Sequence, residues 1–236
     1  GGTEQGDITI SNSVQWFGAN TLTLEADDDI FINANIRAVD GSLVMTADYN
    51  DDAASVGTGQ ILISSGAEVI IDNAAASLTA TAYGNIDDGI AGSGEGAFRV
   101  NGTSSFTSTN GNVLLDSATN NFNGSISVSA GVLDLFGQGT LTLKTISLGS
   151  GGGTFETNGS ITQDATPAFA STGKVSFTVP GSNSINIPKI DGDLTIAGAT
   201  AGGSITLGNV TNTGVLTFDS NTGSVINGVS PATSVA

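Results

Sequence analysis

Cysteine and histidine are both absent from this chain of 236 residues. Without cysteine, neither a disulfide nor a thiolate metal site can form. Without histidine as well, the chain has no Ser-His-Asp or Cys-His catalytic arrangement, and most kinds of zinc site are excluded. A Walker A phosphate-binding loop is missing too. The sequence therefore predicts a protein that is not an enzyme and has no cofactor.

Basic residues are scarce: 5 lysines and arginines face 22 acidic residues, which gives a formal net charge of −17. A surface this acidic repels the phosphates of nucleic acids and the headgroups of anionic lipids. No apolar run approaches the roughly 18 residues that a membrane-spanning helix needs. We therefore expect no nucleic-acid partner and no insertion into a membrane.

A short alternating phrase recurs along the chain. A glycine or asparagine precedes several residues in which apolar side chains alternate with threonine, serine, asparagine or aspartate, as in Gly6–Ile10, Gly41–Ala47 and Gly203–Asn209. Alternation at period two predicts strands with one buried and one solvated face, about twenty of them here. The phrases return roughly every 20 to 25 residues, the period of a solenoid coil. The sequence thus predicts an all-β fold, a parallel β-helix (β-solenoid) of about ten coils.

The alternation also assigns the interior side chains, each of which contributes about 1.5–3 kcal/mol of transfer free energy when fully buried. The residues predicted to point inward are Ile8, Ile10, Leu22, Leu24, Ile30, Ile32, Leu43, Met45, Ile61, Ile63, Val69, Ile71, Val113, Leu115, Ile126, Val128, Leu141, Leu143, Val175, Phe177, Val179, Ile185, Ile187, Leu194, Ile196, Ile205, Leu207, Leu216 and Phe218.

The repeats are not uniform along the chain. Residues 1–118 hold 16 of the 22 acidic residues, and the phrase length changes near Asn120. We expect a single β-helix over residues 1–236 with a change of repeat subtype near 119–124. Three interruptions, at Asp48–Gly57, Tyr83–Gly96 and Gly149–Gly153, are predicted to be loops that leave the coil, because insertions in repeat proteins map to loops.

The segment Gly6–Ala47, with ITI-x3-V-x-W, LTLEA, DIFINANI and GSLVMTA, resembles repeats of filamentous-haemagglutinin-like exoproteins. The segment Asn121–Gln163, which ends in GSITQ, is similar to the second common repeat type of these bacterial surface adhesins. The resemblance implies a right-handed parallel β-helix, export by two-partner secretion and an extracellular address on the bacterial cell surface. The resemblance does not identify any ligand-binding residue in this chain. The chain begins GGTEQGD, which we interpret as an internal or processed fragment of something longer.

Carboxylates are clustered enough to raise the question of a metal site. The candidates for Ca²⁺ are Asp27, Asp28, Asp29, Asp48, Asp51, Asp52, Asp87 and Asp88. If Asp27–Asp29 and Asp48–Asp52 lie about one coil apart, they meet on one face of the rod. There they take up a cation or raise one another's pKa. A solvated acidic turn explains the same residues, and a carboxylate active site of a glycan-active enzyme is a further alternative.

Exposed aromatic residues are the other candidates for contact. Tyr49 and Tyr83 lie in two of the interruptions, and Trp16 precedes Phe17 between strands. Trp16 could stack on a sugar ring, although we expect the Trp16–Phe17 pair to pack over an end or edge of the coils.

The function that these features favour is a structural stalk or filament segment of an adhesin-like protein. Its expected partners are other copies or neighbouring repeats, together with glycans or host surfaces. The alternatives are a β-helical polysaccharide lyase or hydrolase and a Ca²⁺-dependent surface-layer or matrix protein.

Overall fold

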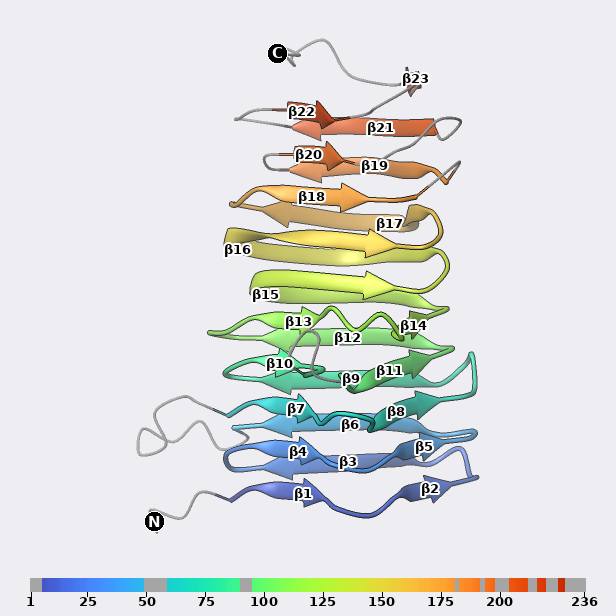
Figure 1. The fold of residues 1–236 in the computed structure, drawn as a ribbon, viewed down its shortest axis with the longest axis vertical. Coiled ribbons are helices and arrows are strands. Elements are labelled where there is room, and N and C mark those ends of the chain that lie inside the picture. The colour runs from blue at the N-terminus through green and yellow to red at the C-terminus, as the bar shows by residue number, and fades with distance from the viewer. Residues whose placement is uncertain are drawn as a thin grey trace.

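The chain forms a β-solenoid in the computed structural model, which describes residues 6–48, 59–89, 95–180, 183–191, 194–197, 204–211, 216–219 and 225–227. Side chains are described up to Ile187, apart from residues 165–167. Every pairing between the described strands is parallel, as rungs of one rod (Figure 1). In these ranges we find no helix that could cross a membrane. The predicted all-β parallel solenoid is confirmed.

Each of the first turns contributes one short strand to each of three ladders. The first ladder contains β1 (Ile8–Ile10), β4 (Ile30–Ile32), β7 (Ile61–Ile63), β10 (Ile86–Asp87) and β13 (Val113–Leu115). The second is a separate five-stranded sheet of β2 (Val14–Trp16), β5 (Ile36–Ala38), β8 (Glu68–Ile71), β11 (Ala97–Val100) and β14 (Asn121–Phe122). The third contains β3 (Thr21–Ala26), β6 (Ser42–Ala47), β9 (Ser77–Ala82) and β12 (Thr103–Ser108).

The cross-section changes after β14, where the five-stranded sheet ends. From there, long strands bend round a corner and serve two ladders each. β15, for example, pairs with β12 through its first half and with β13 through its second. These long strands are β15 (Ser125–Gly137), β16 (Leu141–Thr157) and β17 (Ile161–Ser171). The change of strand pattern lies in the region where the sequence predicts a new repeat subtype; the subtype itself stays a prediction.

About seven turns run from β1 to the end of β17, with most of their side chains described, slightly fewer than the ten coils predicted. The turns differ in length, because Asp29 lies 22 residues after its neighbour Asp7 but 31 residues before Gln60. The backbone ladders continue through β18 (Val175–Thr178), β19 (Ile185–Asp191), β20 (Leu194–Ala197), β21 (Ser204–Thr211), β22 (Leu216–Asp219) and β23 (Val225–Asn227).

One apolar core fills the inside of the rod. Corresponding aliphatic residues stack in register from turn to turn, as Ile8 on Ile30, Ile30 on Ile61 and Ile61 on Ile86. The predicted inward residues from Ile30 to Ile187 are all buried, whereas Ile8, Ile10, Leu22 and Leu24 in the first turn are only partly buried. The predicted residues from Leu194 onward lie outside the described side chains.

Two groups of buried phenylalanines lie in this core. Phe106 meets Phe98 and Phe122 edge-on, with ring centroids 5.3 and 5.9 Å away. Further along, Phe155 stacks on Phe177 at 5.0 Å and lies 5.7 Å from Phe169. Of these six phenylalanines, the sequence analysis assigned only Phe177 to the interior.

The predicted loop at Gly149–Gly153 is wrong, because these residues lie inside β16. The ladder to β15 shifts register there, from Ala130 opposite Leu148 to Val132 opposite Gly152. Gly152 has a φ of 71°, a left-handed conformation that glycine adopts without steric cost. The glycines therefore absorb the extra residues as an irregularity within the strand instead of a loop.

The other two predicted interruptions are described only in part. The loop predicted at Tyr83–Gly96 is wrong where β10 continues the first ladder with the buried Ile86, and residues 90–94 lie outside the described ranges. Of Asp48–Gly57, only Asp48 is described.

Replacing Phe106 with alanine should lower the free energy of unfolding by about 3–5 kcal/mol, because the change leaves a cavity beside two other rings. Phe17→Ala is the matched control: the Phe17 side chain is 67% exposed, and its loss should change stability by about 0.5 kcal/mol or less. Urea denaturation of both variants measures the difference. Equal effects would contradict the assignment of Phe106 to the core.

Candidate functional site

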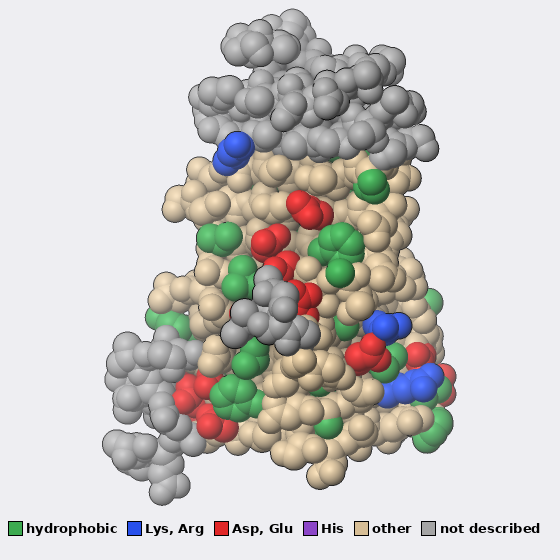
Figure 2. Space-filling model, viewed as in Figure 1, with side chains coloured by type: hydrophobic (Ala, Val, Ile, Leu, Met, Phe, Trp, Pro, Cys, Tyr) green, Lys and Arg blue, Asp and Glu red, His purple; other side chains and the backbone are tan. Residues whose placement is uncertain are grey.

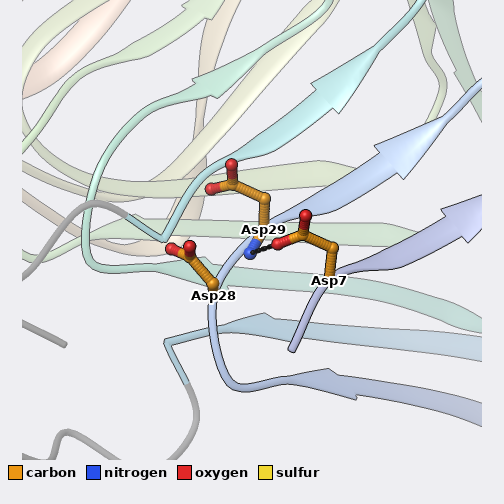
Figure 3. A group of neighbouring side chains, drawn as sticks. All are labelled: Asp7, Asp28 and Asp29. Carbon is orange, nitrogen blue, oxygen red and sulfur yellow. Dashed lines mark hydrogen bonds between the residues drawn. The ribbon is translucent and has the colours of Figure 1, made fainter. Parts of the chain in front are cut away.

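Three carboxylates meet at the corner where the chain enters β1 and β4. Asp7 directly precedes β1, and Asp28 and Asp29 lie in the turn between β3 and β4. Because Ile8 pairs with Ile30, Asp7 and Asp29 lie side by side on successive turns. One oxygen from each of the three carboxylates falls within 4.8 Å of the others, and Figure 3 shows the group.

Hydrogen bonds hold this carboxylate triad, Asp7, Asp28 and Asp29, in place. The backbone N–H of Asp29 donates to Oδ1 of Asp7 at 3.2 Å, the bond drawn in Figure 3. From the next turn, Gln60 donates its backbone N–H to Oδ1 of Asp29 at 2.8 Å and its side-chain amide to Oδ2 at 3.4 Å. Asp28 is buried, Asp29 is half-buried and Asp7 is exposed, so the group opens to solvent on one side.

The charge of the triad is only partly offset. Burial raises the pKa of Asp29, hydrogen bonds from Gln60 lower it, and the negative charges of Asp28 and Asp7 raise it further. Hard divalent cations such as Ca²⁺ bind carboxylate oxygens in clusters of this kind. The triad is therefore the candidate metal site among the described residues.

The structure changes which acidic residues belong to the predicted site. Asp27 is exposed, and its N–H donates to the carbonyl of Gly6 at 3.1 Å. Asp48 lies one turn further along, and its N–H donates to the carbonyl of Asp28 at 3.0 Å. Asp51, Asp52 and Tyr49 lie outside the described residues.

The sequence analysis missed Asp7 as a member of the triad. Aligning the phrase GDITI with DDDIFI, so that Ile8 stands over Ile30, places Asp7 beside Asp29. The signal was therefore present in the repeat, but it needed the register between two turns.

A second acidic group lies further along the rod, on the outer face of the first ladder and its continuation. It consists of Asp87, Asp116, Asp134 and Glu156, and we call it the acidic column; acidic side chains gather in this way on the face in Figure 2. Burial raises the pKa of Asp87 and of Asp134, and the charge of Asp116 raises both further. Glu156 adds to the effect on Asp134.

Of the predicted pair Asp87 and Asp88, only Asp87 faces outward, and its Oδ1 accepts the N–H of Gly89 at 2.7 Å. Asp88 is fully buried. Neither residue belongs to a group of three carboxylates close enough to share an ion, among the residues that the structure describes.

The two aromatic candidates that the structure describes, Trp16 and Tyr83, both form hydrogen bonds within the fold. Trp16 is half-buried against the core, and its Nε1 donates to the carbonyl of Asn20 at 3.0 Å. Tyr83 is half-buried, and its hydroxyl accepts a hydrogen bond from Asn110 at 3.3 Å. Phe17 is the exposed member of the pair that was expected to pack over the coils together, so that expectation holds for Trp16 only.

Two arginines lie on the five-stranded sheet, where they pair with acids. Arg37 contacts Asp72 at 2.7 Å and Arg99 contacts Glu68 at 2.9 Å. Ile70 on β8 is the direct neighbour of Arg37 on β5 and, on its other side, of Arg99 on β11. These two arginines lie on a different sheet from the acidic column.

A family model described as "Repeats of unknown function (DUF5649)" matches residues 58–129. The matched segment runs from just before β7 into β15, which is about three turns of the solenoid. Comparisons with curated proteins and with solved structures gave no match. Over that segment the chain is thus similar to a repeat family, in agreement with its repeating structure.

The triad makes a defined prediction about Ca²⁺. Titration with Ca²⁺ should shift the backbone amide signals of Asp7, Asp28 and Asp29, with saturation at about 10⁻⁴–10⁻³ M because the site is small and partly open. Nuclear magnetic resonance of the labelled chain measures this. Asp28→Asn should abolish the saturable shift, whereas Asp134→Asn in the acidic column should leave it unchanged. Shifts of equal size at both places would indicate general screening of acidic charge.

Proposed function

We propose that this chain is a structural rod segment in the stalk of a filamentous-haemagglutinin-like adhesin on the bacterial cell surface. The observation that supports this most is the parallel ladder, which runs through turn after turn around one apolar core. A structure that grows by stacking similar turns provides length and stiffness. Its stability is approximately the sum of the stabilities of the single turns and of the interfaces between them.

The rod axis runs parallel to the hydrogen bonds between turns. At about 4.8 Å per turn, seven turns extend roughly 34 Å. We propose a right-handed coil, since connections between parallel strands of one sheet are right-handed in about 98% of cases.

Neighbouring repeats or further copies of the chain are the proposed partners at the ends of the rod. β1, β2 and β3 each pair along one edge with a strand of the next turn. The core-facing Ile8 and Leu22 of this first turn are only partly buried. An added turn would extend the ladders and cover these side chains. Glycans or host surfaces are the proposed contacts at the side of the rod.

An extracellular location and two-partner secretion belong to the same proposal. The support comes from the repeat phrases in Gly6–Ala47 and Asn121–Gln163 and from the absence of cysteine, which prevents cross-linking of a chain that crosses a membrane unfolded.

A Ca²⁺-dependent surface-layer or matrix protein is the second candidate, and the carboxylate triad favours it. Calorimetry with and without a chelator separates the two, because an ion that binds the folded state raises the melting temperature. A melting temperature that chelation leaves unchanged would remove metal as a structural element. The glycan-active enzyme gains no comparable support, and turnover of a polysaccharide by the chain would reinstate it.

Immunogold labelling of the organism that produces the chain tests the proposed location. We expect label on the outer cell surface, at the end or along the length of fibres. Small-angle X-ray scattering of the isolated chain should give an elongated particle or end-to-end assemblies. Label confined to the cytoplasm would overturn the surface role, whatever the shape of the particle.

A further inference from the structure

A buried carboxyl group interrupts the apolar core between the fourth turn (β10 to β12) and the fifth turn (β13 to the first half of β15). The side chain of Asp88 has no exposed surface. Its Oδ2 accepts hydrogen bonds from the side-chain amide of Asn120 at 2.5 Å and from the backbone N–H of Ser117 at 3.3 Å. Within the part of the chain that the structure describes, its Oδ1 has no hydrogen-bond partner. An enclosed oxygen without a partner is rare in folded proteins and calls for an explanation.

Asn120, the main partner of Asp88, joins three successive turns. It is fully buried, and its Oδ1 accepts the backbone N–H of Phe98 in the fourth turn at 2.8 Å. Its side-chain amide also donates to the carbonyl of Leu115 in its own turn at 3.0 Å. Its own carbonyl accepts the N–H of Gln138, which follows β15, at 2.7 Å. The joint therefore lies where the solenoid changes from three short strands per turn to long bent strands.

Two neighbouring negative charges oppose the ionisation of Asp88. Asp87 on β10 and Asp116 beyond β13 are the charged residues that act on it. β7 contributes the apolar side chains of Ile61 and Ile63 to the core. Arg99 of β11 forms an ion pair with Glu68 on the outside of the rod. Burial raises the pKa of Asp88 to about 7, an effect that the hydrogen bonds from Asn120 and Ser117 reduce and that Asp116 and Asp87 increase.

We propose that Asp88 and Asn120 form a pH-sensitive joint in the solenoid, closed while the Asp88 carboxyl is neutral and opened locally to water when it ionises. In the neutral state the carboxyl keeps both acceptor bonds at Oδ2 and places no charge in the core. In the ionised state the charge has two donors and an unpartnered Oδ1, so water must enter to solvate it. This inference concerns the rod itself and does not depend on the stalk role.

The sign of the pH dependence follows from the two protonation states. The folded chain holds the Asp88 proton up to about pH 7, whereas the unfolded chain releases it near 3.8. The folded state therefore binds more protons between these values, and the stability that Asp88 supplies is present in full below about pH 4 and is lost as the pH rises to about 7.

Hydrogen exchange at the amides of Ser117 and Phe98 tests the joint, because both donate to it directly. Between pH 5 and pH 8.5, their protection factors, corrected for intrinsic exchange, should fall by about a hundredfold if opening transfers the carboxyl fully to water. The amide of Leu141 lies two turns beyond Asp88 and donates to the carbonyl of Ser160, so its protection should change little.

Asp88→Asn should remove the fall, since the amide keeps one acceptor oxygen and does not titrate in this range. Asp134→Asn is the control, because it removes an acid of the column that does not contact the joint. A fall that persists in Asp88→Asn would overturn the proposal. If that variant does not fold, the carboxyl carbon signal of Asp88 in the unmodified chain decides: a titration midpoint near pH 7 supports the joint, and one below pH 5 overturns it.

Discussion

Stacking in register is the constraint on which the whole structure depends. Each strand uses its backbone groups to bond the turn before and the turn after, so a side chain that points inward in one turn lies on its equivalent in the next. Ile8, Ile30 and Ile61 form such a stack. A shift by one residue would turn every core residue outward, and the burial of the core therefore fixes the register.

The same stacking decides where polar groups gather. Acids at equivalent positions of successive turns are brought about 4.8 Å apart whether or not they suit one another. At the first corner this produces the triad of Asp7, Asp28 and Asp29, whose repulsion is partly balanced by Gln60. On the outer face it produces the acidic column, where Asp116 raises the pKa of both Asp87 and Asp134.

The joint at Asp88 shows a cost of building a rod from unequal turns. Where three short strands give way to long bent strands, Asn120 satisfies backbone groups of neighbouring turns from within the core. A fully buried carboxyl then accepts from Asn120 within the core. A mechanical role and a local response to pH are compatible, since the turns on either side have their own ladders and apolar contacts.

The sequence by itself determined the strand type, the parallel stacking and the inward residues from Ile30 to Ile187, because alternation at period two reports which face is buried. For Asp28 and Asp48 it gave only a condition, that a shared acidic face requires their two groups to lie about one coil apart. Only the tertiary structure decided the neighbours across turns: Asp7 in the triad, the inward Asp88, and Gly149–Gly153 within a strand instead of a loop. Periodicity carries no information on which residue of one turn stands over which residue of the next, because turns of unequal length change that register.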